Sequence, residues 1–203
     1  MGFEDDVDTL AKSLKRVSIE RASLVFVAAS QRLYPLYSNF LSEEHWDPPE
    51  NLGLVLESVW SAVASSNAPG PELAERILNS TPDGEQFDNL KATLALDFCT
   101  CLDAAIRCLR SEARFYFRVI DANLEAIRMP LCFHRTGFLD FPDDDRFSSV
   151  ETEVRSDARY LGEIVRINED IRDALAERLS QQQVEAVQAR AFGNAITWEY
   201  LGL

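Results

Sequence analysis

Residues that could carry out catalysis are few in this sequence of 203 residues, and they lie far apart. Only two histidines occur, His45 and His134, and no glycine-rich phosphate loop, serine-nucleophile elbow or zinc-protease motif accompanies them. The Glu-x-x-His pairs that a di-iron helical bundle needs are absent as well. The sequence therefore predicts no catalytic residue, no metal ligand and no cofactor, while an enzyme of an unrecognised kind stays open.

Asp97 has the least ordinary setting of the carboxylates, because it lies in the most apolar stretch of the chain, residues 88–110. A buried carboxylate must be paired or hydrogen-bonded, or its pKa rises. No basic residue lies one helical turn away, so a partner on another helix is expected. Asp97 could be a structural anchor. Alternatively, it could form a small-ligand pocket together with the aromatic residues Tyr34, Tyr37 and Trp60.

Four arginines recur at steps of three and four, which would place them on one face of a helix as a basic ridge. They are Arg107, Arg110, Arg114 and Arg118. In an acidic protein, such a ridge could hold an anionic ligand. It could equally pack against the acids of a neighbouring helix, namely Glu151, Glu153, Asp157 or Glu163.

Acidic residues dominate the composition, since 34 Asp and Glu against 20 Lys and Arg give a formal net charge of −14. This charge repels phosphate groups, which argues against direct binding to nucleic acid or to an anionic membrane. It favours a protein partner of opposite charge, such as the basic toxin or nuclease that an immunity or antitoxin-like protein inhibits. A homo-oligomer is a further option. The predicted contact residues are Glu4, Asp5, Asp6, Asp8, Asp143, Asp144, Asp145, Trp198 and Tyr200.

The cysteines and the start of the chain bear on the cellular compartment. Cys99, Cys101 and Cys108 fall within ten residues of one helical pattern, and Cys132 stands apart. Their spacing does not fit a zinc site, so buried, free thiols are expected. The acidic start is unlike a signal peptide, and the longest apolar run falls far short of the ~20 residues that span a bilayer. The sequence predicts a cytoplasmic protein.

Apolar residues recur at steps of three and four along almost the whole chain, which is the spacing of amphipathic helices. The stripe from Ile19 to Phe40 predicts one helix, in which Pro35 should cause a kink or a break. Residues 88–110 are apolar on more than one face, which predicts the central helix of a bundle. Asp47 is the expected N-cap of a helix at about 48–65, and further helices are expected at about 71–78, 112–129 and 181–193.

The C-terminal half is expected to contain one long helix, which a capping box at Ser148–Glu151 opens and which continues to about Leu179. Asn168 interrupts the apolar seam of this helix and could fix its register against a neighbour. Residues 192–203 alternate in polarity, which predicts a short extended arm. The fold class is therefore all-α. Residues 1–203 form one compact bundle of about seven or eight helices.

Several short segments resemble the bacterial YjaG-like family, DUF416, whose members have no established function. Arg32–Phe40 resembles the family's Arg-hydrophobe-Tyr-Pro-x-Tyr-x-x-Phe segment, and Trp60 stands where the next helix of the family has a Trp. Leu96–Cys99 and Val150-Glu151 are similar to family segments in the central and long helices. The resemblance covers about residues 17–179. It implies an all-helical fold and transfers no catalytic residue.

Overall fold

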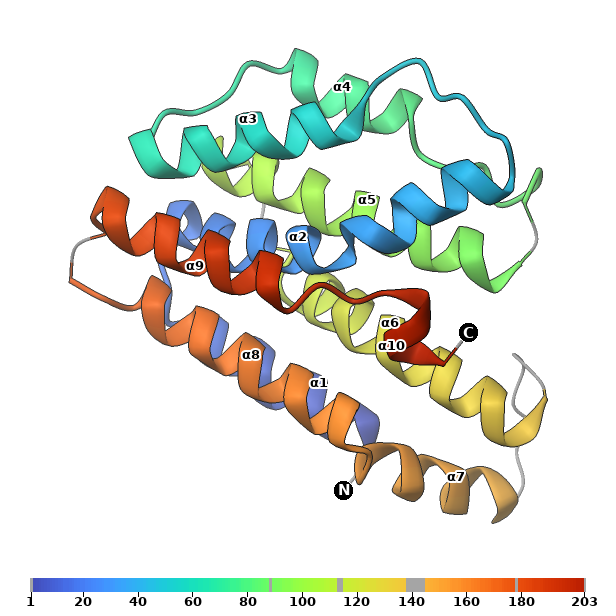
Figure 1. Ribbon diagram of the computed structural model, residues 1–203. Helices are drawn as coiled ribbons and strands as arrows, with labels where there is room; N and C mark the ends of the chain where they lie inside the picture. Colours follow the sequence, from blue (N-terminus) through green and yellow to red (C-terminus); the bar gives the residue numbers. More distant parts are fainter. Residues whose placement is uncertain (1, 88, 113–114, 138–144, 178, 203) are drawn as a thin grey trace.

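Two apolar helices, α2 (Ile19–Glu43) and α5 (Leu90–Leu109), pack side by side at the centre of the structure (Figure 1). Buried side chains cover more than one face of α5, among them Leu94, Cys99, Ile106 and Cys108, whereas Leu96 on the remaining side is 38% exposed. This confirms the prediction of a central helix that is apolar on more than one face. All four cysteines are free and buried, as expected of small apolar side chains in such a core.

The computed structural model describes residues 2–87, 89–112, 115–137, 145–177 and 179–202, with the backbone alone for 145–148. These residues form ten helices and no strand, so the all-α prediction is confirmed with a slightly higher count than expected. None of the described helices has the length and apolar composition that a membrane crossing requires. The helices outside the central pair are α1 (Phe3–Leu14), α3 (Leu52–Ser65), α4 (Glu72–Asn79), α6 (Tyr116–Thr136), α7 (Asp145–Arg155), α8 (Ala158–Ala174), α9 (Gln181–Gly193) and α10 (Trp198–Leu201).

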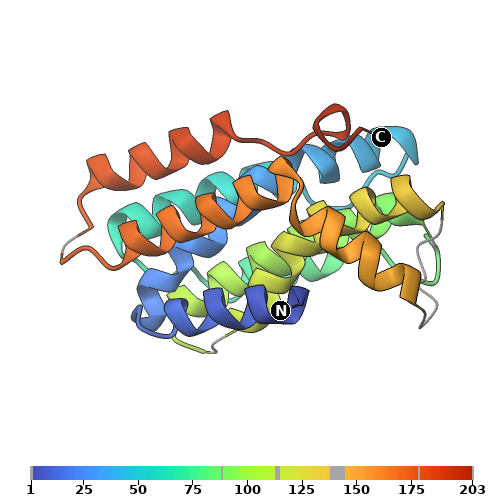
Figure 2. The same cartoon turned by 90° about the horizontal axis from the view of Figure 1, so that it is seen from below.

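The remaining helices cover the central pair on two sides. Helices α3 and α4 lie on one side, and α1, α6 and α8 lie on the other, with α9 along α2 and α3 (Figure 1). Figure 2 shows α1, α7 and α8 on the face that is turned to the viewer. The acidic first turn of α1 suits the positive end of the helix dipole, and its apolar residues Phe3, Val7, Leu10 and Leu14 are buried. This helix was not predicted from the sequence.

Two prolines lie inside helices that continue past them. Helix α2 runs through Pro35 without a break, although Figure 1 shows that it changes direction along its length. The carbonyl of Arg32, three residues earlier, accepts a hydrogen bond from the N–H of Ile196 at 2.7 Å. The C-terminal arm therefore bonds to a backbone carbonyl in the helical turn that precedes the proline. Helix α6 continues past Pro130, where the sequence predicted its end, because buried residues such as Leu131 extend its apolar face.

The single long helix predicted in the C-terminal half is wrong, because the structure divides this segment into α7 and α8. Asp157 lies between them in an extended conformation, and its Oδ1 atom accepts a hydrogen bond from the N–H of Arg159 at 2.9 Å. The N–H of Ser156 bonds back to the carbonyls of Thr152 and Glu153. An aspartate N-cap therefore begins a new helix within a continuous apolar seam.

The C-terminal arm packs against the bundle through a short helix rather than as a fully extended segment. Thr197 caps α10 by accepting a hydrogen bond from the N–H of Tyr200 at 3.1 Å. Ile196, Trp198 and Leu201 are buried. The alternation that predicted an extended arm thus reflects an anchored helical turn.

Candidate functional site

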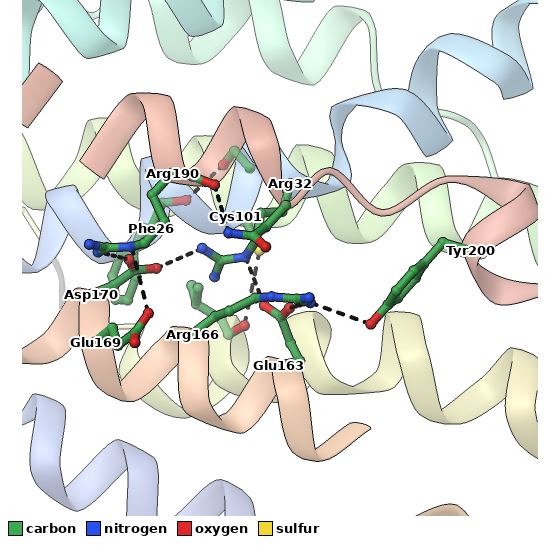
Figure 3. Close-up of polar contacts among 12 residues, drawn as sticks. Phe26, Arg32, Cys101, Glu163, Arg166, Glu169, Asp170, Arg190 and Tyr200 are labelled. Carbon is green, nitrogen blue, oxygen red and sulfur yellow. Dashed lines mark hydrogen bonds and ion pairs between the residues drawn. The ribbon is translucent and has the colours of Figure 1, made fainter. Parts of the chain in front are cut away.

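The most deeply buried charges lie where α2 meets α8 (Figure 3). The guanidinium of Arg32 is only 1% exposed, and its Nε donates to Oε1 of Glu163 at 2.8 Å. Its Nη1 donates to Oδ2 of Asp170 at 2.6 Å. Both acids are fully buried. Burial alone would lower the pKa of Arg32, but the two carboxylates outweigh it and raise the pKa above its ordinary value.

The second oxygen of each acid also has a cationic partner. Oδ1 of Asp170 accepts from Nη2 of Arg190 on α9 at 2.7 Å, and Oε2 of Glu163 accepts from Nη1 of Arg166 at 3.1 Å. We call these five side chains the buried ion network (Figure 3). Each of the four carboxylate oxygens has a guanidinium partner, although Nη2 of Arg32 is buried without an acceptor among the described residues. The network is therefore suited to fixing the register of α2, α8 and α9.

A different arrangement of acids lines a groove of about 600 Å³ between the first turn of α1, α6 and α7. Five carboxylates and a single guanidinium face this groove, which gives it a formal charge of −4. The aromatic side chains of Phe3 and Phe117 complete its lining. We call it the acidic groove, and its charged residues are Glu4, Asp5, Asp121, Glu125, Arg128 and Glu151.

Some charges of the acidic groove are used by the protein itself. Asp5 accepts a hydrogen bond from the N–H of Gly2 at 2.6 Å. Oε1 of Glu151 accepts from the N–H of Phe3 at 2.6 Å. Arg128 pairs with Oε1 of Glu125 at 2.7 Å and lies over the Phe3 ring, 4.6 Å from its centroid. These contacts hold the walls of the groove in place.

Other acceptors of the acidic groove remain unused. Within the described part of the chain, Glu4 and Asp121 have no hydrogen-bond or ion-pair partner. Oε2 of Glu125 is buried, and no described residue donates to it. A buried acceptor without a donor is costly unless a ligand, a water molecule or a proton satisfies it. The groove therefore offers the carboxylates of Glu4 and Asp121 to an incoming cation, above the buried Oε2 of Glu125.

The carboxylates around the acidic groove also destabilise one another when charged. Burial raises the pKa of Asp121 and of Glu125, and Arg128 lowers both without cancelling the rise. Glu4 adds to the rise for Asp121, and Asp121 adds to it for Glu125. Behind the groove, burial together with Glu125 and Asp121 holds the pKa of Asp97 well above its ordinary range. A positive charge in the groove would relieve this repulsion.

Two arginines of the predicted basic ridge reach a second hollow, of about 280 Å³, between α4 and α5. Nε of Arg107 donates to Oδ2 of Asp103 at 2.7 Å, whereas the exposed Arg118 has no partner among the described residues. Arg110 instead pairs with Glu112 and donates to the carbonyl of Pro69. Arg114 lies outside the described residues. The structure thus brings only part of the ridge to one pocket, which we call the arginine pocket.

The DUF416 family model, which describes a protein of unknown function, matches residues 9–121 of this sequence, more than half of the chain. The chain belongs to the DUF416 family. It is similar to a DUF416 family protein from Shewanella baltica OS155 in a crystal structure, with a TM-score of 0.72 and 14% identity over 97% of this chain and 96% of that one. At this identity the likeness shows the fold alone. No curated protein matches the chain. The narrower YjaG-like assignment stays a prediction.

The aromatic residues of the predicted ligand pocket belong to the core of this DUF416 protein. Tyr34 and Tyr37 pack against the Phe98 ring, with centroids 5.6 and 4.9 Å away, and the Tyr37 hydroxyl donates to the carbonyl of Ser80. Nε1 of Trp60 donates to Gln31 at 3.0 Å. Asp97 is adjacent to Phe98 in sequence but interacts with α6, so the structure does not unite it with the three described aromatics.

The predicted contact residues in the C-terminal arm pack against the protein itself, whereas those of the Asp-rich segment lie largely outside the described residues. Trp198 is 7% exposed, and Nζ of Lys91 lies 5.5 Å from its ring centroid. Tyr200 packs against Arg166, whose guanidinium lies 5.7 Å from the ring centroid. Asp143 and Asp144 lie outside the described residues, as does the side chain of Asp145, which begins α7.

Sequence reasoning found one wall of the acidic groove and missed the other. The acidic start of the chain, with Glu4 and Asp5, was predicted as a contact region. Asp121, Glu125 and Glu151 were not singled out as groove residues. A usable signal was present, because Asp121 and Glu125 are like charges four residues apart on one helix, which is unfavourable without a cation nearby.

Proposed function

We propose that this DUF416 protein binds a basic protein partner through the acidic groove, as an immunity or antitoxin-like protein would bind a basic toxin or nuclease. The observation that carries the proposal is the pair of unused carboxylates, Glu4 and Asp121, beside the buried and unbonded Oε2 of Glu125. They lie together in a groove of about 600 Å³ with a formal charge of −4. Such a groove suits Arg or Lys side chains that a partner inserts.

A guanidinium fits the chemistry of the groove better than a proton does. Its planar N–H groups can bond Asp121 and Glu4 together, and its charge stabilises nearby carboxylates in their ionised form. Phe117 is 50% exposed at the groove, so its ring offers a stacking surface for the same guanidinium. Affinity would thus come from a few central contacts, while the net charge of −14 would accelerate encounter.

The encounter would take place in the cytoplasm, the compartment that the sequence predicts. Four free and buried thiols support a reducing environment. The partner would need no surface of its own beyond an exposed basic segment, which toxins that act on nucleic acid carry because they bind phosphate.

The test uses a short, fluorescently labelled Arg-rich peptide as the probe, with binding followed by fluorescence anisotropy at low and high salt. Removing two groove charges with Glu4→Gln and Asp121→Asn should weaken binding about tenfold or more. A matched double variant, Glu57→Gln with Glu185→Gln, loses the same net charge from exposed positions on α3 and α9 and should bind like the wild type. Equal weakening by both double variants would contradict the proposal.

A second candidate function rests on the arginine pocket. Its unpaired Arg118 lies beside apolar rim residues, of which Leu78 is 74% exposed and Leu96 is 38% exposed. This combination suits a small carboxylate with an apolar body. Phenylbutyrate, used as a probe in calorimetry, should then bind at one site. Arg118→Gln should remove that binding, whereas Arg16→Gln, at another exposed arginine, should leave it unchanged.

A further inference from the structure

Helix α8 carries a stripe of exposed residues that no described part of the protein covers. The positions follow one another at steps of three and four residues, which is the spacing of a coiled-coil seam. Three members are large apolar side chains, since Leu161 is 48% exposed, Val165 56% and Leu175 41%. The full stripe, which we call the α8 seam, consists of Ala158, Leu161, Val165, Asn168, Arg172 and Leu175.

The opposite face of α8 already supplies the contacts that hold this helix in the bundle. Tyr160, Ile167 and Ile171 are buried in the core, and Glu163 and Asp170 belong to the buried ion network. The α8 seam is therefore a second apolar stripe on a helix that needs only one for folding. Single exposed apolar residues are ordinary, but a periodic row of them along one helix indicates an interface.

We propose that the α8 seam is a self-association surface, on which α8 of a second copy packs antiparallel across a two-fold axis at Asn168. Leu161 and Leu175 lie seven residues before and after Asn168, so this axis brings each of them opposite the other in the second copy. The two ends of the seam are thus complementary to each other about its centre. An isologous dimer interface requires this property.

The polar members of the seam fix the centre and the direction of the pair. Nδ2 of Asn168 donates to the carbonyl of Ile164 at 2.9 Å, and its Oδ1 atom and second N–H remain available to the same amide of the other copy. A buried Asn in a seam selects one register in this way. A parallel pair would bring the two Arg172 side chains together, whereas the antiparallel pair keeps them apart and packs each Arg172 stem near Val165.

The size and charge of the seam determine how strong this dimer is. A helix of 17 residues is roughly 26 Å long, and one helix pair of that length gives an interface at the small end of specific complexes. Each copy also carries a net charge of −14 that opposes association. The seam itself contains no acid. We expect a dimer that dissociates on dilution and that salt strengthens, because salt screens the repulsion between copies.

Analytical ultracentrifugation of the full chain at several concentrations and salt levels tests this dimer. Leu161→Glu with Val165→Glu should raise the dimer dissociation constant about tenfold or more, and circular dichroism should show the helices intact. A matched double variant, Leu54→Glu with Leu78→Glu, adds the same charges at apolar positions that are 55% and 74% exposed on α3 and α4. It should dimerise as the wild type does. A wild-type monomer under every condition, or equal loss in both double variants, would overturn the proposal.

A cysteine placed at the two-fold axis gives an independent readout. The four native cysteines are buried, so Asn168→Cys adds an accessible thiol to a chain whose own thiols are protected. Because a disulfide needs Cα atoms within about 7 Å, oxidation should link two Asn168→Cys copies rapidly. Ser58→Cys, exposed on α3, serves as the control and should link slowly. Equal linking rates for both positions would contradict an axis at Asn168.

Discussion

The buried ion network and the acidic groove both contain carboxylates, but they differ in how many of these carboxylates have a cationic partner. In the network, Glu163 and Asp170 are fully buried, and every one of their oxygens has a guanidinium partner. In the groove, Asp121 and Glu125 lie beside other acids and share one cation, Arg128, which pairs with Glu125, and burial still raises the pKa of both. The deeper acids are thus the better satisfied ones, although burial is the more costly for them.

This difference separates acids that hold the fold together from acids that remain available. A carboxylate with two cationic partners gains nothing from a further ligand. A carboxylate whose neighbours are acids, and whose pKa is raised, is stabilised by any cation that reaches it. The contrast therefore supports our proposal that the groove serves recognition while the network fixes the helix register, and each role can be tested separately.

The largest effect is expected in the network. Arg32→Met leaves Glu163 and Asp170 buried with fewer cationic partners, which should lower the free energy of unfolding by about 3–5 kcal/mol. Unfolding in guanidinium chloride measures this change in the free energy of unfolding. The exposed Arg16, changed to Met, is the matched control and should cost little. If Arg32→Met were as stable as the control, the network would not hold α2 and α8 together.

Behind the groove, Asp97 should destabilise the protein at neutral pH. Its pKa in the folded state is raised well above the ordinary 3.8, so stability falls as the pH rises from 3.8 through the raised value. Asp97→Asn removes this loss and should raise the free energy of unfolding at neutral pH by on the order of 1 kcal/mol. At a pH below 3.8, variant and wild type should agree. Denaturant unfolding at a series of pH values measures this difference. A variant that is less stable than the wild type at neutral pH would contradict a raised pKa of Asp97.

Asp157 should show the opposite pH dependence, because it is a paired acid. Its hydrogen bond with the Arg159 side chain is the main cause that holds its pKa well below the ordinary range, so its contribution is present above 3.8 and disappears as the pH falls. Asp157→Ala also removes the N-cap of α8 and should cost about 1 kcal/mol at neutral pH. The same denaturation series measures it. A cost that persisted in acid would exclude the charged form as its origin.

The smallest effect is a proton linkage in the groove. Because the pKa values of Asp121 and Glu125 are raised, binding of a cationic peptide should lower them and release protons at mildly acidic pH. Affinity for the Arg-rich peptide should therefore increase with pH. Calorimetry in buffers of different ionisation enthalpy counts the protons. Binding without proton exchange would place the peptide away from these two residues.

Local periodicity was enough to predict most of the helical fold. The apolar stripes of α2 and α5 were read correctly, because burial imposes the helical repeat on the sequence. The break between α7 and α8 was not predicted, because the apolar seam continues across it. Only the capping role of Asp157 marks the boundary. At Pro130, by contrast, a helix end was predicted where α6 continues, because buried contacts beyond the proline outweigh the lost hydrogen bond.

The two charged sites were harder to predict, because their members lie far apart in the sequence. Arg32 is separated from Glu163 by 131 residues and from Asp170 by 138. Phe3 and Glu151, which join two walls of the groove, are 148 residues apart. No local pattern encodes such pairings. The acidic start of α1 could be recognised as a charged surface, but its companions on α6 and α7 depend on the packing of three helices.

Recognition through the acidic groove is tested most directly by mapping a bound Arg-rich peptide with two-dimensional amide NMR spectra of the full chain. The largest chemical-shift changes should fall on the first turn of α1 and on α6 around Phe117 and Asp121. They should vanish at high salt. Changes centred on other helices, or a spectrum that the peptide leaves unaltered at low salt, would contradict the account.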